Sequence, residues 1–284
     1  MAIRKSVAAF TALLATGLLL AASHANAAKP ITKPKFDPSA DKVDLFDAIK
    51  EGQLEVKMIP KNALGGNLLI SNKSDQPLSV KVPDAFVGVH VLKQFGGGGQ
   101  QGGGGQQGGG GGQTQGGGQQ GGGLGQGGGG QQGGGQGFFS IPPAKTVKMP
   151  YNGVCLEHGK KDPKPNMKYE IRPVDTFSKD PVLKELLKLV GSGRVNAQAA
   201  QAAAWNLSNK MSWGQLASKA RTHLGGRAPT RYFSQAQLFW GQNLVAAAKV
   251  RADEAAKRAE NAPAAKPKPA PRSRVNSNTR ASAR

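Results

Sequence analysis

Two hydrophobic periods divide the chain into regions. In the segment 41–95, apolar and polar positions alternate, as in Leu54, Val56 and Met58. A period of two places the apolar side chains on one face of a strand and the polar side chains on the other, which is typical of half-buried antiparallel sheets. The alternation returns in the segment 138–173. The two segments together are predicted to form one small antiparallel β-sandwich.

Beyond the second β segment the pattern becomes helical. Asp180 followed by Pro181 has the residue types of a helix N-cap and a first helical position, and apolar residues then recur at i, i+3, i+4 and i+7. Ser212 and Ser234 each begin an S-x-x-Q capping box, and the second box opens a long predicted helix. Residues 174–260 are therefore predicted to form a small helical domain.

A tract of glycine and glutamine separates the two β segments. Residues 96–137 contain 28 of the 41 glycines and 12 glutamines, with only Thr114 and Leu124 besides. Glycine loses the most conformational entropy on ordering and has no side chain to bury, so the tract is expected to be a disordered loop insertion outside the core. The predicted fold class is α+β: a small antiparallel β-sandwich with this long insertion, followed by a small helical domain.

The two ends of the chain have other compositions. Residues 1–27 have the charged, apolar and small-residue order of a secretory signal peptide, ending in the cleavage sequence Ala25-Asn26-Ala27. Residues 28–40 and the basic tail 261–284 are rich in proline and lysine or arginine and are predicted to be disordered. We therefore expect an exported protein in the periplasm, at the cell envelope or outside the cell, with no transmembrane segment after signal cleavage.

The charge is large and unevenly distributed. The chain has 38 Lys and Arg against 17 Asp and Glu, and the stretch 186–252 has no carboxylate. This asymmetry favours an anionic partner, such as envelope polysaccharide or lipid head groups, although a solvated basic surface without a partner has the same composition. The tail lacks aromatic residues for base stacking, so no specific nucleic acid is expected. The candidate binding residues are Arg194, Lys210, Lys219, Arg221, Arg227 and Arg231.

The chain shows no motif of an enzyme. It has neither a G-x-S-x-G nucleophile elbow nor a phosphate-binding G-x-x-x-x-G-K-[ST] loop, and its histidines do not have zinc-site spacing. A single cysteine excludes a disulfide within the chain. We therefore predict a non-enzymatic structural or binding protein without catalytic residues, metal or other cofactor.

The segment around Cys155 leaves one alternative open. Cys155 and His158 form a C-x-x-H pair, Met167 follows, and His90 lies on an earlier predicted strand. One Cys, two His and one Met are the ligand types of a blue-copper site, and the segment resembles the cupredoxin loop in that order. The interval from His158 to Met167 is longer than in cupredoxins and contains several lysines. A buried structural thiol is the other interpretation.

A second alternative couples Cys155 to a glutamine. The residues flanking Cys155 and Gln201 resemble those of thioester adhesin domains, in which a Cys on a strand is joined to a Gln. The Thr-Gln-x-Ala motif of those domains is absent here, and Gln201 and Trp205 also have the i, i+4 spacing of one helix face. Trp205, Trp213 and Trp240 are all predicted to anchor the helices in the core.

A broader resemblance concerns the architecture. The strand–turn–strand sequence 66–78 resembles immunoglobulin-like sandwich modules of bacterial secreted proteins. The stretch 154–205 is similar to a set of uncharacterised bacterial secreted proteins in which such a sandwich precedes a helical region. The resemblance implies a sandwich followed by helices in an exported protein, and it implies no chemistry.

Overall fold

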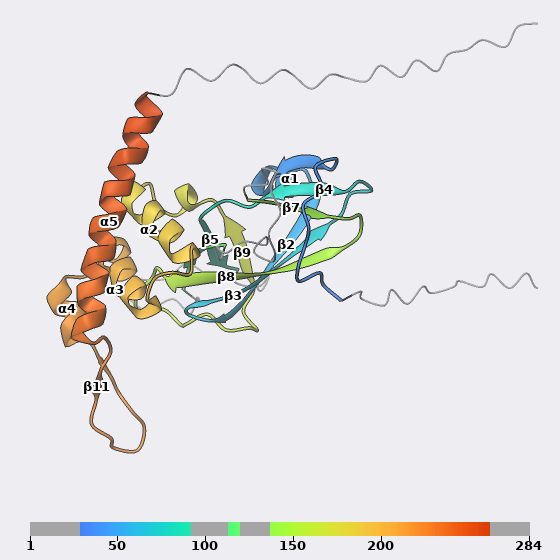
Figure 1. Ribbon diagram of the computed structural model, residues 1–284. Coiled ribbons are helices and arrows are strands. Elements are labelled where there is room, and N and C mark those ends of the chain that lie inside the picture. Colours follow the sequence, from blue (N-terminus) through green and yellow to red (C-terminus); the bar gives the residue numbers. More distant parts are fainter. Residues whose placement is uncertain (1–28, 92–112, 120–136, 262–284) are drawn as a thin grey trace, which may run out of the picture.

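The computed structural model describes residues 29–91, 113–119 and 137–261. The predicted signal peptide, most of the Gly/Gln tract and the basic tail beyond residue 261 lie outside these ranges. Strands and helices both occur in the described residues, which confirms the α+β class. The helices gather at one side of a central barrel, and a small second sheet with one short helix lies at the other side (Figure 1).

Six antiparallel strands form the closed barrel. In spatial order they are β2 (Leu54–Asn62), β3 (Gly65–Asn72), β8 (Thr146–Cys155), β6 (Gln115–Gln119), β5 (Phe86–His90) and β9 (Tyr169–Arg172). The circle closes where Met58 of β2 pairs with Tyr169 of β9. Buried and more exposed positions alternate along β8 and β9 as the sequence predicted, but the two-layer sandwich is wrong. Because β6 pairs with both β5 and β8, it joins two strand edges that a sandwich would leave open.

The second sheet has three strands and caps one side of the barrel. It consists of β1 (Asp41–Asp44), β4 (Leu78–Lys81) and β7 (Phe138–Ile141), with β1 parallel and β7 antiparallel to β4. The short helix α1 (Leu45–Lys50) follows directly. Leu45, Phe86 and Phe139 are fully buried in one core shared by this sheet, α1 and the barrel. The sequence patterns did not predict β1 or α1.

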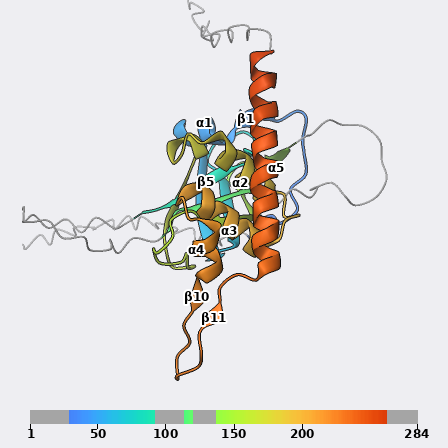
Figure 2. The ribbon, with the colours of Figure 1, turned by 90° about the vertical axis from the view of Figure 1, so that its left-hand side faces the viewer.

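The helical region follows β9 and begins with a 3-10 turn. Its helices are η1 (Val174–Thr176), α2 (Pro181–Gly191), α3 (Ala197–Ser208), α4 (Trp213–Ser218) and α5 (Gln235–Glu260). The predicted caps are confirmed: the Asp180 side chain accepts a hydrogen bond from the Val182 amide, and Ser212 and Ser234 both form complete capping boxes. The 26-residue α5 packs beside α2 and α3 and faces the viewer in Figure 2.

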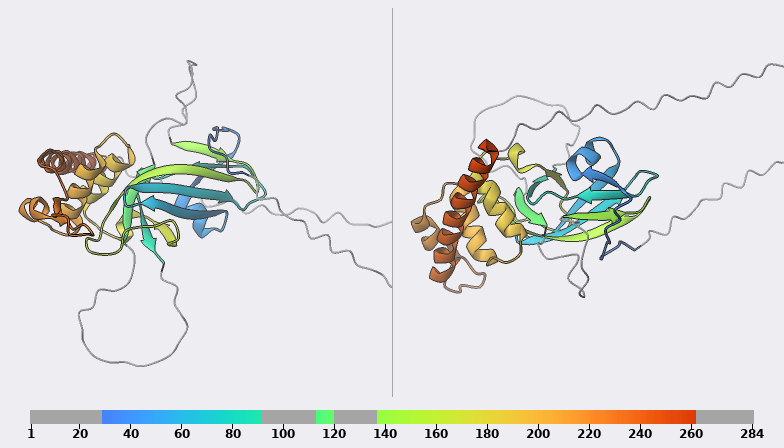
Figure 3. Two further views of the ribbon diagram at one scale, coloured as in Figure 1. Left: turned by 90° about the horizontal axis from the view of Figure 1, so that it is seen from below. Right: turned by 45° about the horizontal axis from the view of Figure 1, so that its top comes forward.

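The barrel and the helices share a hydrophobic core. Val87 and Val154 of the barrel pack in one buried cluster with Leu186 and Leu187 of α2. A third cluster, around Trp205 of α3, lies between α3, α4 and the start of α5. Two further views show the helices lying directly against one side of the strands (Figure 3). The predicted boundary at residue 174 therefore separates strands from helices, but it does not separate two cores.

Strand β6 comes from inside the Gly/Gln tract, which corrects the expectation that the whole tract lies outside the core. Polar side chains before and at the start of the strand hold it in place: Gln113 donates to the Lys160 backbone oxygen at 2.8 Å, and Gln115 and Thr114 add further hydrogen bonds. The Gln115 amide donates to the backbone oxygens of Asn62 and Ala63, at 3.0 Å each, and accepts from the Tyr151 hydroxyl at 2.7 Å. The amide and the hydroxyl of Thr114 both donate to one carboxylate oxygen of Glu157.

The glycines of β6 permit close packing rather than disorder. A Cβ atom added to Gly116 would lie 2.7 Å from Leu187 Cδ2 of α2, and one added to Gly118 would lie 2.2 Å from the backbone oxygen of Asp84. The backbone contact leaves no room for a side chain at Gly118, and a side chain at Gly116 would displace the leucines packed there. The absence of side chains, which suggested disorder from composition alone, is what lets α2 lie against this strand.

None of the helices in the described ranges combines the length and the apolar character needed to cross a lipid bilayer.

Candidate functional site

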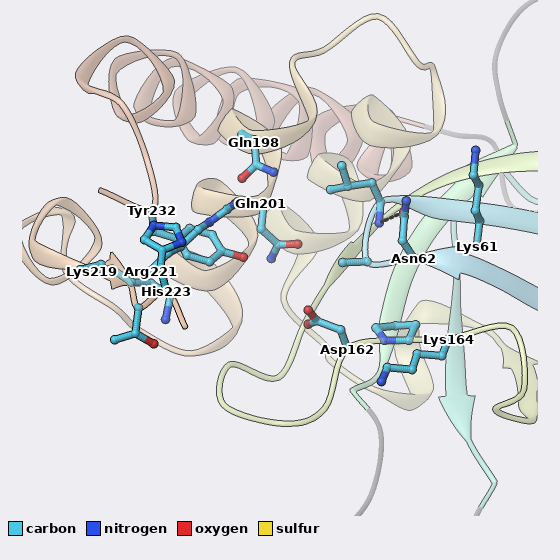
Figure 4. A pocket seen from close by; sticks show the side chains of 15 residues that line it. Lys61, Asn62, Asp162, Lys164, Gln198, Gln201, Lys219, Arg221, His223 and Tyr232 are labelled. Atoms are coloured by element: carbon cyan, nitrogen blue, oxygen red, sulfur yellow. Dashed lines mark hydrogen bonds between the residues drawn. The ribbon is translucent and has the colours of Figure 1, made fainter. Parts of the chain in front are cut away.

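A cavity of about 870 Å³ lies between the barrel and the helical region. Its walls come from the β2–β3 turn, the loop after β8, helix α3 and the hairpin formed by β10 (Ala220–Arg221) and β11 (Thr230–Arg231) (Figure 4). These four segments are distant in sequence, so the cavity exists only in the folded chain. Its polar lining includes Lys61, Asn62, Asp162, Lys164, Gln198, Gln201, Lys219, Arg221, His223 and Tyr232.

The lining of the cavity has more cationic than anionic residues. Four Lys and Arg side chains contribute to it, and Asp162 is the one carboxylate among its described lining residues. Asp162 already accepts a hydrogen bond from the Gln113 side chain at 3.0 Å. A concave wall with an excess of one charge concentrates its field inside the cavity. The arrangement is therefore suited to an anionic ligand.

Aromatic rings hold the cations at the base of the hairpin. The Lys219 ammonium lies 5.4 Å from the ring centroid of Trp205 and 5.0 Å from that of Tyr232. The Arg221 guanidinium lies 4.3 Å from the Tyr232 ring. Cation–π contacts of this kind fix long, flexible side chains in place. The basic groups of the hairpin base are thus positioned before any ligand arrives.

His158 completes this cluster from the barrel side. Its Nε2 lies 2.8 Å from the Lys219 ammonium, and its ring contacts Trp205 edge to face at 4.7 Å. Burial, and secondarily the neighbouring Lys219 charge, lower the pKa of His158 below its ordinary value. The neutral imidazole therefore accepts a hydrogen bond from the ammonium, because an ammonium group can only donate.

This contact predicts a specific loss of stability in acid. The pKa of His158 is lower in the folded chain than in the unfolded chain, so the unfolded chain binds more protons and the free energy of unfolding falls as the pH drops below about 6.5. Urea unfolding measured across this pH range should show the decline. In His158→Gln, which keeps a polar acceptor but does not titrate, the decline should be smaller. An identical pH profile in both proteins would contradict the assignment.

Gln201 joins helix α3 to the barrel next to the cavity. The pairing of β3 with β8 ends at Asn152, so the Cys155 backbone lies beyond the last β3 partner. The Gln201 side chain occupies the place of a β3 partner beside Cys155. Its oxygen accepts from the Cys155 amide at 2.9 Å and its nitrogen donates to the Cys155 oxygen at 2.8 Å. Gln201 is only 2% exposed. The side-chain amide thus acts as a short extension of the sheet.

Cys155 is a buried free thiol. Burial, with a smaller contribution from Asp162, raises the pKa of Cys155 to about 12, and its Sγ lies 3.9 Å from the backbone oxygen of Ala63. No group of three or more His, Cys, Asp and Glu side chains within the described ranges is placed to hold a metal ion. Of the other proposed copper ligands, His158 contacts Lys219, and Met167 accepts from the Tyr169 hydroxyl at 3.8 Å. The structure does not bring the cupredoxin-like ligand set together.

The six candidate binding residues separate into two groups. Lys219 and Arg221 line the cavity, while Arg227 and Arg231 lie on the same exposed hairpin. Arg194, in the turn after α2, and Lys210, in the turn after α3, do not line this cavity. The structure therefore gathers four of the six on one feature.

Sequence reasoning missed the barrel's contribution to the cavity. Lys61 and Lys164 line the cavity but lie outside the carboxylate-free stretch 186–252, from which the candidate binding residues were predicted. Local sequence contains no signal that brings them to the hairpin. The prediction that all three tryptophans are core anchors is also wrong for Trp240, which is 57% exposed on α5, whereas Trp205 is buried.

Comparisons of the chain with known protein families, with curated proteins and with solved structures found no match.

Proposed function

We propose that this chain is an exported, non-enzymatic binding protein for anionic material of the cell envelope, such as acidic polysaccharide or lipid head groups. The observation that carries the proposal is the cavity, whose lining includes four Lys and Arg residues and one carboxylate. The hairpin beside the cavity has no carboxylate. Export rests on the signal-peptide pattern of residues 1–27.

The geometry at the hairpin base supports specific rather than diffuse attraction. Exposed charges alone bind weakly and are screened by salt over about 8–10 Å. Here Lys219 and Arg221 are held against Trp205 and Tyr232, so less side-chain entropy is lost when an anion binds between them. A polyanion that occupies the cavity and runs along the hairpin would contact the cations of the cavity wall and the arginines of the hairpin.

Paired substitutions with equal charge changes test this site. The double variant Lys61→Gln/Lys164→Gln removes two cations from the cavity wall, and Arg194→Gln/Lys210→Gln removes two cations outside it. If the cavity is the site, the first variant should bind an acidic polysaccharide such as polygalacturonate about tenfold more weakly, because two favourable charge contacts are lost. The second should lose much less. Binding would be measured by calorimetry at about 0.01 M and about 0.15 M salt.

Equal losses in the two double variants would mean that only the total charge matters. Binding that does not weaken with salt would contradict an electrostatic site altogether. Lys61 and Lys164 are both exposed, so neither substitution is expected to disturb the fold.

A thioester adhesin is the second candidate, and the contact between Gln201 and Cys155 favours it. In this reaction the Cys155 Sγ would add to the Gln201 side-chain carbonyl carbon, and the carbon–nitrogen bond would break. Ammonia would then leave with the thiol proton. The Cys155 amide, which donates to the Gln201 oxygen, is placed to stabilise negative charge developing there. The raised pKa of Cys155 opposes the reaction, because it keeps the thiol protonated.

Intact mass decides between a thioester and two separate side chains. A thioester lowers the mass of the native protein by about 17 Da, the mass of the ammonia that leaves. The mass of Cys155→Ser would then match its sequence without this deficit. A native mass that also matches the sequence would exclude the thioester and leave Gln201 as a structural link between α3 and β8.

A further inference from the structure

The hairpin that walls the cavity also projects beyond the body of the molecule. It extends past α4 as a narrow loop in two views at right angles (Figures 1 and 2). At its far end Leu224 is 98% exposed, and Gly225 and Gly226 both turn the chain with φ values of 80° and 73°. The projecting loop therefore presents an apolar side chain that is accessible to a partner outside the chain.

The base of the hairpin is braced, so the loop is held away from the body. The Tyr232 amide donates to the Lys219 oxygen at 2.8 Å, and the Tyr232 ring stacks under Arg221. Farther out, His223 Nε2 lies 2.8 Å from the Thr230 hydroxyl. These contacts tie the two arms of the hairpin together and present Leu224 to the surroundings instead of to the helices.

The charge around the exposed leucine bears on the kind of partner that the hairpin fits. The hairpin carries Arg221, Arg227 and Arg231 in addition to Lys219 at its base, and it has no Asp or Glu. An apolar tip among cations matches an anionic lipid bilayer, in which head groups contact the cations while the apolar side chain enters the acyl region. A soluble polysaccharide offers the anions but no apolar phase for Leu224.

We propose that the β10–β11 hairpin docks on anionic lipid bilayers by inserting Leu224 between the head groups while its arginines contact the phosphates. The inference rests on the proposed affinity for anionic envelope material, and it names the lipid surface as the partner of the hairpin. The cavity behind the hairpin is left free for a polyanion.

Vesicle binding by matched variants tests the insertion. Leu224→Gln removes the apolar tip, and Val250→Gln removes a 57% exposed apolar side chain on α5, away from the hairpin. Affinity for vesicles of phosphatidylcholine and phosphatidylglycerol in equal amounts should fall roughly tenfold in Leu224→Gln, since one buried Leu contributes about this much. It should be unchanged in Val250→Gln. Equal affinity of both variants and the native protein would overturn the inference.

An environment-sensitive label reports the insertion directly. The native cysteine, Cys155, is only 1% exposed, so Leu224→Cys can be labelled selectively with the fluorophore NBD. On addition of the same vesicles the emission should increase and shift to the blue. A label at Gln76→Cys, in the exposed turn before β4, should not respond. A label at position 224 that responds to polygalacturonate and not to vesicles would overturn the lipid assignment.

Polygalacturonate binding separates failure of this inference from failure of the proposed function. Leu224→Gln should bind this polysaccharide as tightly as the native protein, because its cations are intact. If the native protein binds polygalacturonate but its vesicle binding does not depend on Leu224, the inference fails alone. If the native protein binds neither probe at low salt, the proposed function fails with it.

Discussion

A chain lacking residues 113–119 is expected to show no cooperative unfolding transition. The deletion removes β6 and the side chains that anchor it, and it opens the barrel between β5 and β8. It also uncovers the face of Leu187 that lies against Gly116. The loss exceeds what a marginally stable domain tolerates. Thermal unfolding followed by circular dichroism would report it.

A deletion of equal length elsewhere in the tract is the control. Removing residues 121–127 takes out seven residues of similar composition, and the free energy of loop closure changes only slowly with length. A cooperative transition should remain in this variant. If both deletions leave the transition intact, β6 does not close the barrel.

A point substitution tests the same packing without shortening the chain. In Gly117→Ala the added Cβ would lie 2.3 Å from the backbone oxygen of Asn152, so the strand must shift, and the free energy of unfolding should fall by about 3 kcal/mol. Gly214→Ala, in α4, is the matched control, because its nearest neighbour is a side-chain oxygen 3.8 Å away. There alanine should stabilise the helix by about 0.5–1 kcal/mol.

Gln201→Leu is expected to produce the largest loss of stability outside the barrel strands. The substitution keeps the side-chain volume but leaves the buried amide and oxygen of Cys155 without the partners that Gln201 supplies. Two orphaned buried groups cost about 3 kcal/mol together, which corresponds to a melting temperature roughly 10 °C lower. Differential scanning calorimetry would measure the change.

Gln198→Leu, one turn earlier on α3, is the control for this prediction. Its side-chain oxygen has no hydrogen-bond partner within the described part of the chain, so replacing it removes no internal hydrogen bond. The melting temperature should change by less than a third as much. Equal effects at the two positions would show that polarity on this face of α3, and not the link to Cys155, is what the fold requires.

Sequence reasoning succeeded where the physical cause is local. Capping by Asp180 and Ser234 depends on side chains within three residues of the helix start, and both caps are present. The alternation of buried Tyr169 and Ile171 with exposed Glu170 and Arg172 likewise follows from strand geometry alone. The long last helix begins directly after the capping-box residue Ser234, as predicted, and it ends at the predicted end of the helical region, residue 260.

The barrel and the cavity could not be predicted, because both depend on contacts between distant segments. Alternation is the same in a sandwich and in a barrel, and only the pairing of β6 with two neighbours distinguishes them. The one local hint was Thr114, the single hydroxyl in the Gly/Gln tract, whose side chain contacts Glu157. Lys61 and Arg221 line the same cavity only after the helices have packed against the barrel.

Because β6 comes from a repetitive tract, the folding chain must place one particular copy of its sequence in the barrel. The sequence Gln-Gly-Gly-Gly-Gln of residues 115–119 occurs again at 132–136, so the glycine pattern does not distinguish one copy from the other. The distinguishing feature is the preceding Thr114, which has no counterpart in the tract. The hydrogen bond from its hydroxyl to Glu157 favours one threading of the chain over near-equivalent ones. A single hydroxyl group thus distinguishes the segment that forms β6 from the other copy of the same sequence.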